Sequence, residues 1–397
     1  VQFQDAFSEL SGNRLYLDQE YILIRGNDST QNNQLRLAHS FKVEDKNYSY
    51  SQEDATTYFG PALENIDLND EVKHFEYQNE VKAIYQQNTL GTFEFAAQAI
   101  DFRYEYNSIY VQEDGTLIPN LLSGNVYSLG GKYNNTIGKL SYEGEAKYNV
   151  AGEFDGSFIK GNLNYKLTEA IDVNAYLSVS SRAPDFNYLL NQSAYENYNW
   201  FNDFTNIDTQ ILGGKISHNK FGEIEASLTQ INNYTYFGTV REEGEEGETT
   251  SLENVFTNVQ AFQATDQDVR YLKVKATNDM QFGVFGMNHS LLYQNVINGE
   301  NLLPTPDFVT RNTLYYQDHW FEKATFIQTG ISFKYFTDFN STMFNPVLNE
   351  FVVQDFTNLE GFYNVDVFFN AKIRTARLFF VLENATSLLE GNTNFTA

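Results

Sequence analysis

Residues 363–374, which read YNVDVFFNAKIR, constrain the fold more than any other part of the chain. The odd-numbered positions from Tyr363 to Ile373 are apolar, and most of the even-numbered positions are polar or charged. Successive side chains of a β-strand point to opposite faces of a sheet. One face of this strand therefore suits a hydrophobic surface and the other suits water. Because the pattern recurs along the chain, it predicts a closed β-barrel in an outer membrane.

The aromatic content favours a membrane barrel over a soluble core. Aromatic residues make up 16% of the 397 residues, with 34 Phe and 27 Tyr, yet the mean hydropathy is −0.45. A membrane barrel places aromatic side chains on its outer band and in girdles at both interfaces, while half of each strand faces a polar interior. No apolar run approaches the roughly 18–20 residues of a spanning helix. Any membrane span must therefore be made of strands.

The charge and the side-chain inventory exclude several functions. The chain has 26 Lys and Arg against 52 Asp and Glu, a net charge of −26, which disfavours binding to nucleic acid because phosphate contacts need a basic surface. There is no cysteine for a disulfide, a metal site or a nucleophile. The histidines are isolated, without the spacing of a metal or catalytic site: His39, His74, His218, His289 and His319. We therefore expect no enzymatic activity, no metal and no cofactor.

Acidic residues are concentrated in stretches that read as loops, at 53–54, 64–71 and 242–248. Solvated exterior loops are the simplest interpretation of such runs. The alternative is binding of divalent cations near charged lipid headgroups, although no stretch has the spacing of a calcium-binding loop.

Period-2 alternation predicts sixteen strands. They lie at about 12–25, 33–44, 72–87, 91–107, 122–135, 138–150, 156–168, 171–183, 207–219, 221–240, 258–279, 282–296, 307–319, 321–338, 362–374 and 376–387. Within 91–107 the apolar register changes midway, from Phe93 and Phe95 to Phe102 and Tyr104, which predicts a β-bulge.

The connections between these strands alternate in length. The short ones lie near 88–90, 136, 168, 219, 279 and 374, and the long ones at 45–71, 108–121, 184–206, 241–257, 297–306 and 339–361. Outer-membrane barrels have short periplasmic turns and longer extracellular loops. The predicted fold is therefore an all-β, antiparallel, up-and-down transmembrane barrel that forms a single domain over 1–397. The first predicted strand would begin, and the last would end, on the extracellular side, whereas bacterial barrels normally have an even number of strands with both ends on the periplasmic side. About 18 strands are therefore predicted in the full-length protein, with an N-terminal region and a final strand outside this chain.

The charged side chains of the polar register carry the functional hypothesis. A Lys or Arg on the lipid face costs about 2–4 kcal/mol at the bilayer midplane, so these side chains are expected to face the lumen. The predicted pore-lining residues are Glu76, Glu80, Lys82, Glu143, Glu145, Lys147, Lys160, Lys166, Asp172, Arg182, Asp366, Lys372 and Arg374. The predicted lipid-facing residues are Leu35, Leu37, Leu140, Tyr148, Leu163, Tyr165, Val173, Leu177, Val365, Val367 and Phe369. Facing charges of both signs set the ion preference of a pore, and the acidic loops suggest a mild preference for cations.

Several segments, mostly in the second half of the chain, share a specific pattern: 183–200 (APDFNYLLNQSAYENYNW), 231–237 (INNYTYF), 304–339, 345–348 (NPVL), 363–384 and 392–395 (NTNF). In these segments the chain resembles the outer-membrane putative porins of Bacteroidota. The resemblance implies a porin-like barrel in the outer membrane of a Gram-negative bacterium, secreted through a cleaved signal peptide. It implies no catalytic motif.

The first functional hypothesis is a passive channel for small hydrophilic solutes, with outer-membrane lipid and lipopolysaccharide around it. The loops at 184–206 and 241–257 are the segments most expected to fold into the lumen. The second hypothesis is a structural or accessory subunit of an outer-membrane assembly, with an occluded lumen and other outer-membrane proteins as partners. The third is a barrel of the TonB-dependent receptor type.

Two motifs bear on these alternatives. The stretch SRAPDF at 181–186 is similar to one common in TonB-dependent receptors, although Pro184 also serves simply to end a strand. The aromatic stretch YENYNWFNDF at 195–204 is interpreted as packing of an ordered loop or as an aromatic girdle, and the alternative is a stacking platform for sugars or a contact with a partner.

Overall fold

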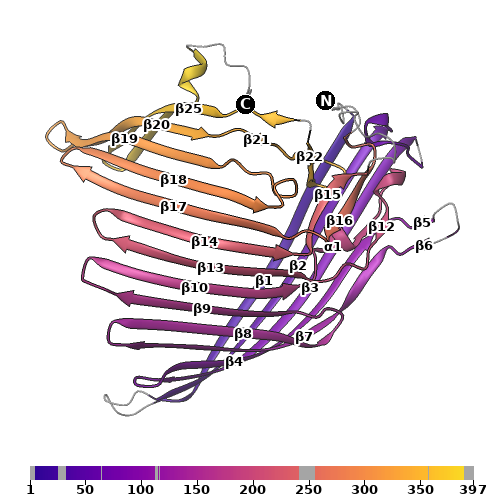
Figure 1. Ribbon diagram of the computed structural model, residues 1–397, viewed down its shortest axis with the longest axis horizontal. Coiled ribbons are helices and arrows are strands. Elements are labelled where there is room, and N and C mark those ends of the chain that lie inside the picture. The colour runs from indigo at the N-terminus through magenta and orange to yellow at the C-terminus, as the bar shows by residue number, and fades with distance from the viewer. Residues whose placement is uncertain are drawn as a thin grey trace.

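The computed structural model describes residues 5–25, 33–63, 65–111, 115, 117–240, 255–355 and 357–388. Its main element is a 16-stranded antiparallel sheet in which the strands pair in chain order (Figure 1). The strands of this wall are β1 (Ala6–Ile24), β2 (Gln34–Asp54), β3 (Ile66–Gln87), β4 (Gly91–Tyr106), β7 (Leu121–Ile137), β8 (Leu140–Gly152), β9 (Ser157–Lys166), β10 (Ile171–Arg182), β13 (Ile207–His218), β14 (Gly222–Asn232), β17 (Val269–Phe282), β18 (Phe285–Asn298), β19 (Phe308–Trp320), β20 (Thr325–Phe336), β25 (Phe362–Ile373) and β26 (Ala376–Leu382). Across the described ranges, no helix is long and apolar enough to span a bilayer.

The wall curls strongly. In Figure 1, β1 to β3 run steeply at the right, the middle strands cross the picture, and β20 lies at the upper left. The expected all-β class and the 16 antiparallel strands are confirmed. β1 and β26 are the edges of the sheet, and within the described residues they are not paired with each other. Closure and a total of about 18 strands therefore stay predictions.

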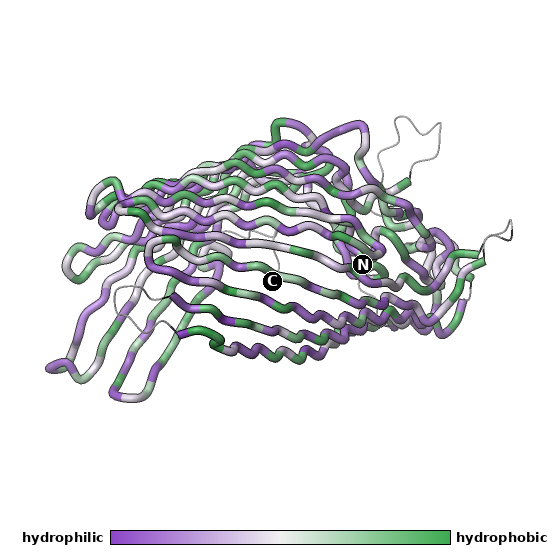
Figure 2. The backbone as a smooth tube through the Cα atoms, turned by 90° about the horizontal axis from the view of Figure 1, so that it is seen from below, coloured by the Kyte–Doolittle hydropathy of each residue, from purple (hydrophilic) through white to green (hydrophobic). Residues whose placement is uncertain are grey.

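Strand register separates the side chains into two faces. In β8 and β9, Glu145 lies opposite Lys160 on one face, and Tyr142 lies opposite Leu163 on the other. Directly opposed residues of an antiparallel pair share a face, so the register can be followed from strand to strand across the wall. Figure 2 shows hydrophilic and hydrophobic residues alternating along these strands.

Small sheets and short helices form a second layer against one face of the wall. A four-stranded sheet joins β15 (Tyr234–Thr239) and β16 (Val259–Ala264) to β22 (Met343–Asn345) and β23 (Glu350–Val353). Around it lie η1 (Thr57–Phe59), α1 (Phe186–Leu189), β11 (Leu190–Asn191), η2 (Glu196–Tyr198) and β12 (Trp200–Phe201). Smaller pairs are β5 (Tyr110–Val111) with β6 (Leu117–Ile118), and β21 (Phe339–Asn340) with β24 (Asn358–Leu359).

We call described residues 55–63, 183–206, 233–240, 255–268 and 337–355 the loop cap. All these segments connect wall strands at the same end of the sheet, the end with the long connections. The face of the wall that contacts the loop cap is called the inner face. Figure 1 shows β15, β16 and α1 between the steep strands β1 to β3 and the rest of the wall.

Several sequence expectations were wrong in detail. The predicted strand 221–240 divides into β14 and β15, and 258–279 divides into β16 and β17. In each case the part beyond the loop end of the wall belongs to the loop cap. The last predicted strand ends at Leu382 and is followed by η3 (Ala385–Leu388). At the loop end, β8 and β9 are joined by residues 153–156 alone, so the alternation of short and long connections is not strict.

The predicted β-bulge in 91–107 is absent: β4 pairs without a register shift with β3 and with β7. The apolar residues change faces for another reason. Phe95 is exposed on the outer face, whereas Phe102 and Tyr104 are buried on the inner face against loop residues. On the outer face at the same level, Arg103 forms an ion pair with Glu105 at 2.8 Å. The inner face thus becomes apolar where the outer face becomes polar.

Strand length explains this inversion. β3 has 22 residues, about twice the 9–11 residues with which a tilted strand crosses a bilayer. Its loop-end part carries Glu71 and Lys73 on the outer face, paired at 3.2 Å, and Leu68 and Asp70 buried on the inner face. We infer that this part of β3 projects beyond the membrane and supports the loop cap.

The two faces predict opposite responses to a new cation. Leu163 is exposed on the outer face of β9, and its neighbour Asn162 lies on the inner face opposite Glu143. We expect Leu163→Arg to destabilise the protein folded in phospholipid vesicles by about 2–4 kcal/mol, measured by denaturant unfolding. The matched variant Asn162→Arg should change stability little because water and Glu143 lie beside the new side chain. Equal destabilisation by the two variants would contradict the assignment of faces.

Candidate functional site

The residues predicted to line a pore share the inner face. Apart from Arg374, each lies in a wall strand, in the register that the cross-strand pairs connect from β3 to β25. Arg374 follows the end of β25 and lies in the turn before β26, and Arg182 ends β10 and forms an ion pair with Asp185 at 3.1 Å. The residues predicted to face lipid all lie in the opposite register. Their roles toward water and lipid stay predictions.

Ion pairs between neighbouring strands organise the charges of the inner face. Lys42 Nζ lies 2.7 Å from Glu44 and 3.1 Å from Glu76, which links β2 to β3. Further pairs join neighbouring strands around the wall: Lys82 with Glu94 at 3.3 Å, Lys132 with Glu143 at 3.0 Å, Lys215 with Glu223 at 3.4 Å, and Lys334 with Asp366 at 2.6 Å. Lys147 donates to Gln98. Such pairs retain their charge only where water or hydrogen bonds compensate the loss of hydration.

The loop cap has an apolar core of its own. Phe59, Tyr195 and Tyr198 are completely buried in it, together with Val259 and Val352. The core continues onto the wall through the buried side chains of Tyr50 in β2 and Leu68 in β3. Because its members come from loops that follow strands on both halves of the wall, this core ties the loop end of the curled sheet together.

Hydrogen bonds fix the aromatic residues of the cap. The Tyr198 hydroxyl donates to the Phe256 carbonyl at 2.6 Å and accepts from Asn345 Nδ2 at 2.8 Å. The Tyr195 hydroxyl donates to Gln52 Oε1 at 2.7 Å. Buried hydroxyl groups are costly without partners, so these bonds select one arrangement of the loops. The interpretation of 195–204 as packing of an ordered loop is confirmed.

Asp70 fastens this loop to the wall. Its carboxylate accepts a hydrogen bond from the Ser193 hydroxyl and another, at 2.8 Å, from the backbone N–H of Ala194. Burial in the projecting part of β3 disfavours the ionised form and raises the pKa of Asp70 to about 6, although both hydrogen bonds oppose the shift. Asp70 is therefore a contact whose strength depends on pH.

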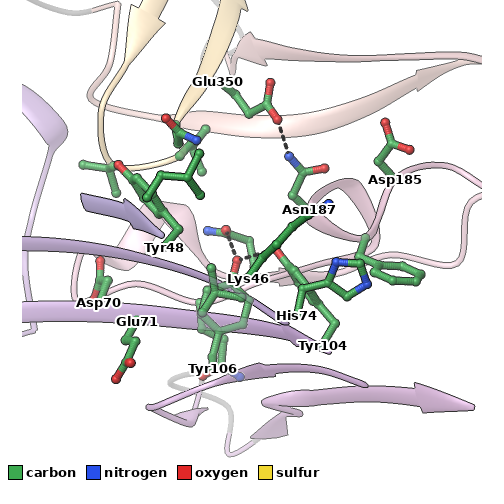
Figure 3. Close-up of a pocket in the computed structure, with 18 of the residues that line it drawn as sticks. Lys46, Tyr48, Asp70, Glu71, His74, Tyr104, Tyr106, Asp185, Asn187 and Glu350 are labelled. Carbon is green, nitrogen blue, oxygen red and sulfur yellow. Dashed lines mark hydrogen bonds between the residues drawn. The ribbon is translucent and has the colours of Figure 1, made fainter. Parts of the chain in front are cut away.

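A cavity of about 610 Å³ lies between the loop cap and the inner face of β2 to β4 (Figure 3). On the inner face, β2 to β4 contribute Lys46, Tyr48, Asp70, His74, Glu76, Tyr104 and Tyr106, and the cap contributes Asp185, Phe186, Asn187 and Glu350. Figure 3 shows His74, Tyr104 and Tyr106 below Asn187, which is directed toward Glu350. Aromatic faces next to carboxylate, amide and cationic groups are suited to a small polar ligand.

The polar groups of the cavity are held in fixed positions. Asn187 Nδ2 donates to Glu350 at 2.6 Å, and the Tyr106 hydroxyl donates to Asn191 Oδ1 at 2.7 Å. Burial raises the pKa of Glu350, although the bond from Asn187 opposes this. His74 Nε2 is buried and has no hydrogen-bond partner among the described residues. In the described part of the chain, no group of three or more His, Asp and Glu is arranged to hold a metal ion.

Sequence patterns had not revealed this cavity. Asp70, Tyr104 and Glu350 come from β3, β4 and β23, and only three-dimensional packing brings them together. The loop expected at 184–206 does fold over the inner face. Of the loop expected at 241–257, Val255 and Phe256 lie in the core of the cap, and 241–254 lies outside the described residues, as do the acidic stretch 242–248 and the motif NTNF at 392–395.

Comparisons with known proteins agree with the fold. A family model described as "Putative porin" matches residues 1–397. A comparison with curated protein sequences finds no match. Among solved structures, the copper transporter OprC is 12% identical with a TM-score of 0.61, over 94% of this chain and 59% of that one.

Two receptors are similar to a comparable extent. BauA, the ferric preacinetobactin receptor of Acinetobacter baumannii, is 11% identical with a TM-score of 0.56, over 96% of this chain and 59% of that one. A mutant of the ferric enterobactin receptor PfeA of Pseudomonas aeruginosa is 11% identical with a TM-score of 0.51, over 95% and 64%. At this identity the similarity is one of fold, that of outer-membrane β-barrels. The chain spans less than two thirds of the length of each of these structures.

The raised pKa of Asp70 predicts that the cap is held more firmly at acid pH. If Asp70 has its ordinary pKa of 3.8 in the open loop and about 6 in the closed loop, opening becomes easier as pH rises from about 4 to 6 and then levels off. The difference corresponds to roughly 2–3 kcal/mol. Protection of the amides at 193–201 from hydrogen exchange, corrected for intrinsic rates, should fall about tenfold or more over this range.

Asp70→Asn is the matched variant, because it keeps the size of the side chain and removes the titration. It should abolish most of the pH dependence, leaving only the smaller contribution of Glu350, and should lower protection overall because one acceptor is lost. A protection profile of the unmodified protein that is flat between pH 4 and 7 would contradict this role of Asp70.

Proposed function

The chain belongs to the putative porin family, and from this premise we propose that it is a porin-like channel through which small hydrophilic solutes diffuse passively. Family and fold indicate an outer-membrane protein. The observation that carries the proposal is the inner face, where ion pairs such as Lys132 with Glu143 and Lys334 with Asp366 recur around the wall. Charges in this number favour an aqueous interior over a packed one.

The proposal includes closure of the wall. An exposed sheet edge leaves unpaired N–H and C=O groups, which the hydrocarbon region of a bilayer does not tolerate. The edges at β1 and β26 therefore need strand partners in a membrane. Closure with about 18 strands falls within the range of bacterial barrels and leaves a lumen wide enough for water.

On this proposal the loop cap is the selectivity element of the channel. It lies at the end with the long connections, and a solute entering there passes Asp70, Tyr104 and Glu350 in the cavity under the cap. Acidic and aromatic groups at this entrance favour cationic or neutral polar solutes over anions.

Two other functions have specific support. The compact apolar core of the cap supports an accessory barrel with an occluded lumen that docks other outer-membrane proteins. The fold similarity to ferric-siderophore receptors supports a receptor-type barrel, with the cavity of about 610 Å³ as its ligand site. The charged inner face favours the channel over both.

Single-channel recording of the full-length protein in planar bilayers tests the proposal. We expect the unmodified protein to conduct and Phe59→Ala to conduct more or to flicker, because removal of this fully buried ring weakens the cap by about 3–5 kcal/mol. Phe95→Ala is the matched control, since Phe95 is 67% exposed on the outer face and should leave conductance unchanged.

The outcomes separate the candidate functions. A silent unmodified protein with a conducting Phe59→Ala variant would establish an occluded barrel. If neither the unmodified protein nor the Phe59→Ala variant conducts, although both are folded in the bilayer, the proposal of a channel is contradicted.

A further inference from the structure

A recess of about 650 Å³ lies at the short-turn end of the wall, opposite in the fold to the loop cap. It is formed by the ends of β19, β20, β25 and β26. Its charged residues are Lys323, Lys372, Arg374 and Arg377, and His319 stands beside them. No Asp or Glu is among the described residues that line it. In a chain with a net charge of −26, such a purely basic recess is an exception.

Two of its cations face each other directly. In the pairing of β25 with β26, Lys372 lies opposite Arg377, and like charges at opposed positions destabilise a sheet. Elsewhere on the inner face, lysines lie next to carboxylates, as Lys82 does at 3.3 Å from Glu94. Within the part of the chain that the structure describes, no ion pair joins Lys372 or Arg377 to an acidic side chain.

The two turns at the recess hold cations in an unusual backbone conformation. Arg374 has a φ of 54° and Lys323 a φ of 70°, the left-handed region that glycine and asparagine adopt most readily. Strain of this kind at residues other than glycine often accompanies a functional constraint. Phe321 and Glu322 share this conformation with Lys323 in the first turn. Of the four residues, Lys323 and Arg374 line the recess, and both carry a positive charge.

The basic character is confined to one part of the short-turn end of the wall, at β19, β20, β25 and β26. A second recess, of about 480 Å³, lies among the short turns of β10, β13, β14, β17 and β18, and its charged residues include Asp172, Glu223 and Asp279. The short-turn end therefore has an acidic side and a basic side, which a general excess of either charge would not produce.

We propose that the basic recess binds phosphate groups. The guanidinium groups of Arg374 and Arg377 supply forked donors that match phosphate oxygens, and Lys372 and Lys323 add point charges. Gln328 and Asn370, which are joined by a hydrogen bond of 3.3 Å, offer neutral amides on its floor. A bound phosphate would also relieve the repulsion between Lys372 and Arg377. This site does not depend on conduction through the lumen.

Two sources of phosphate reach this position. Soluble phosphate compounds have access from water because Lys372, Arg374 and Arg377 are exposed. Lipid headgroups are the second source, because Phe321, 73% exposed, and Trp320 give the turn of β19 and β20, which borders the recess, the aromatic character of a membrane interface.

Calorimetric titration of the purified full-length protein in nonionic detergent with pyrophosphate tests the proposal. Charge-assisted hydrogen bonds are roughly twice as strong as neutral ones, so the double variant Lys372→Gln/Arg377→Gln should weaken binding by about tenfold or more per cation removed. Arg374→Asn should weaken it as well, and its folding is not threatened because asparagine tolerates the left-handed turn.

Lys166→Gln is the matched control, because Lys166 lies on the same face near another short turn but opposite Asp172. It should leave pyrophosphate binding within about twofold, a free-energy change below about 0.5 kcal/mol. Absence of binding to the unmodified protein, or equal weakening by the control, would overturn the proposal.

A second arm identifies the source. The titration is repeated in nanodiscs of phosphatidylcholine with and without phosphatidic acid. Loss of pyrophosphate binding in the presence of phosphatidic acid, seen in the unmodified protein and in the Lys166→Gln control alike, would assign the site to lipid phosphate. Unchanged binding would assign it to soluble phosphate. Each result supports a phosphate site and names its occupant.

Discussion

Backbone pairing across neighbouring strands is the constraint on which the whole structure depends. A chain without an apolar helix can enter a bilayer only if its N–H and C=O groups are satisfied by a sheet. The 16-stranded wall does this in simple chain order. Because successive side chains of a strand point to opposite faces, each side chain of the wall is then assigned to one face or the other. The hydrophobic outer face, the ion-paired inner face and the position of the loop cap all follow from that assignment.

The loop end of the wall shows how the same geometry serves a different environment. At the loop end of β2, β3 and β4, the outer face carries charged pairs and the inner face meets folded loops. The side chains follow: Glu71 and Arg103 point outward, and Leu68, Phe102 and Tyr104 are buried inward. One continuous strand therefore changes which of its faces is apolar without any break in pairing. The cap is the cause of that change, because it supplies an apolar surface inside the wall.

Much of the wall was predictable from the sequence, since alternation over ten or more residues leaves little choice of face, as in β8, β9 and β25. The loop cap was not predictable. Its core joins Phe59, Tyr198 and Val352 across nearly 300 residues of chain, and no local pattern encodes such contacts. For the same reason the change of register in β4 was interpreted as a bulge, when its cause lies in Phe186 and other loop residues packed against it. The cavity beneath the cap and the basic recess at the opposite end likewise depend on the pairing of separate strands.

The assignment of faces is tested most directly by a scan of single cysteines along β25, because the chain contains no cysteine of its own. Each position from Asn364 to Asn370 would carry an environment-sensitive fluorophore, with the protein folded in vesicles and quenchers supplied either in water or in the lipid. The account predicts strict alternation: lipid quenching at Val365, Val367 and Phe369, and aqueous quenching at Asn364, Phe368 and Asn370. Quenching by lipid at both sets of positions, or by neither quencher at either set, would contradict it.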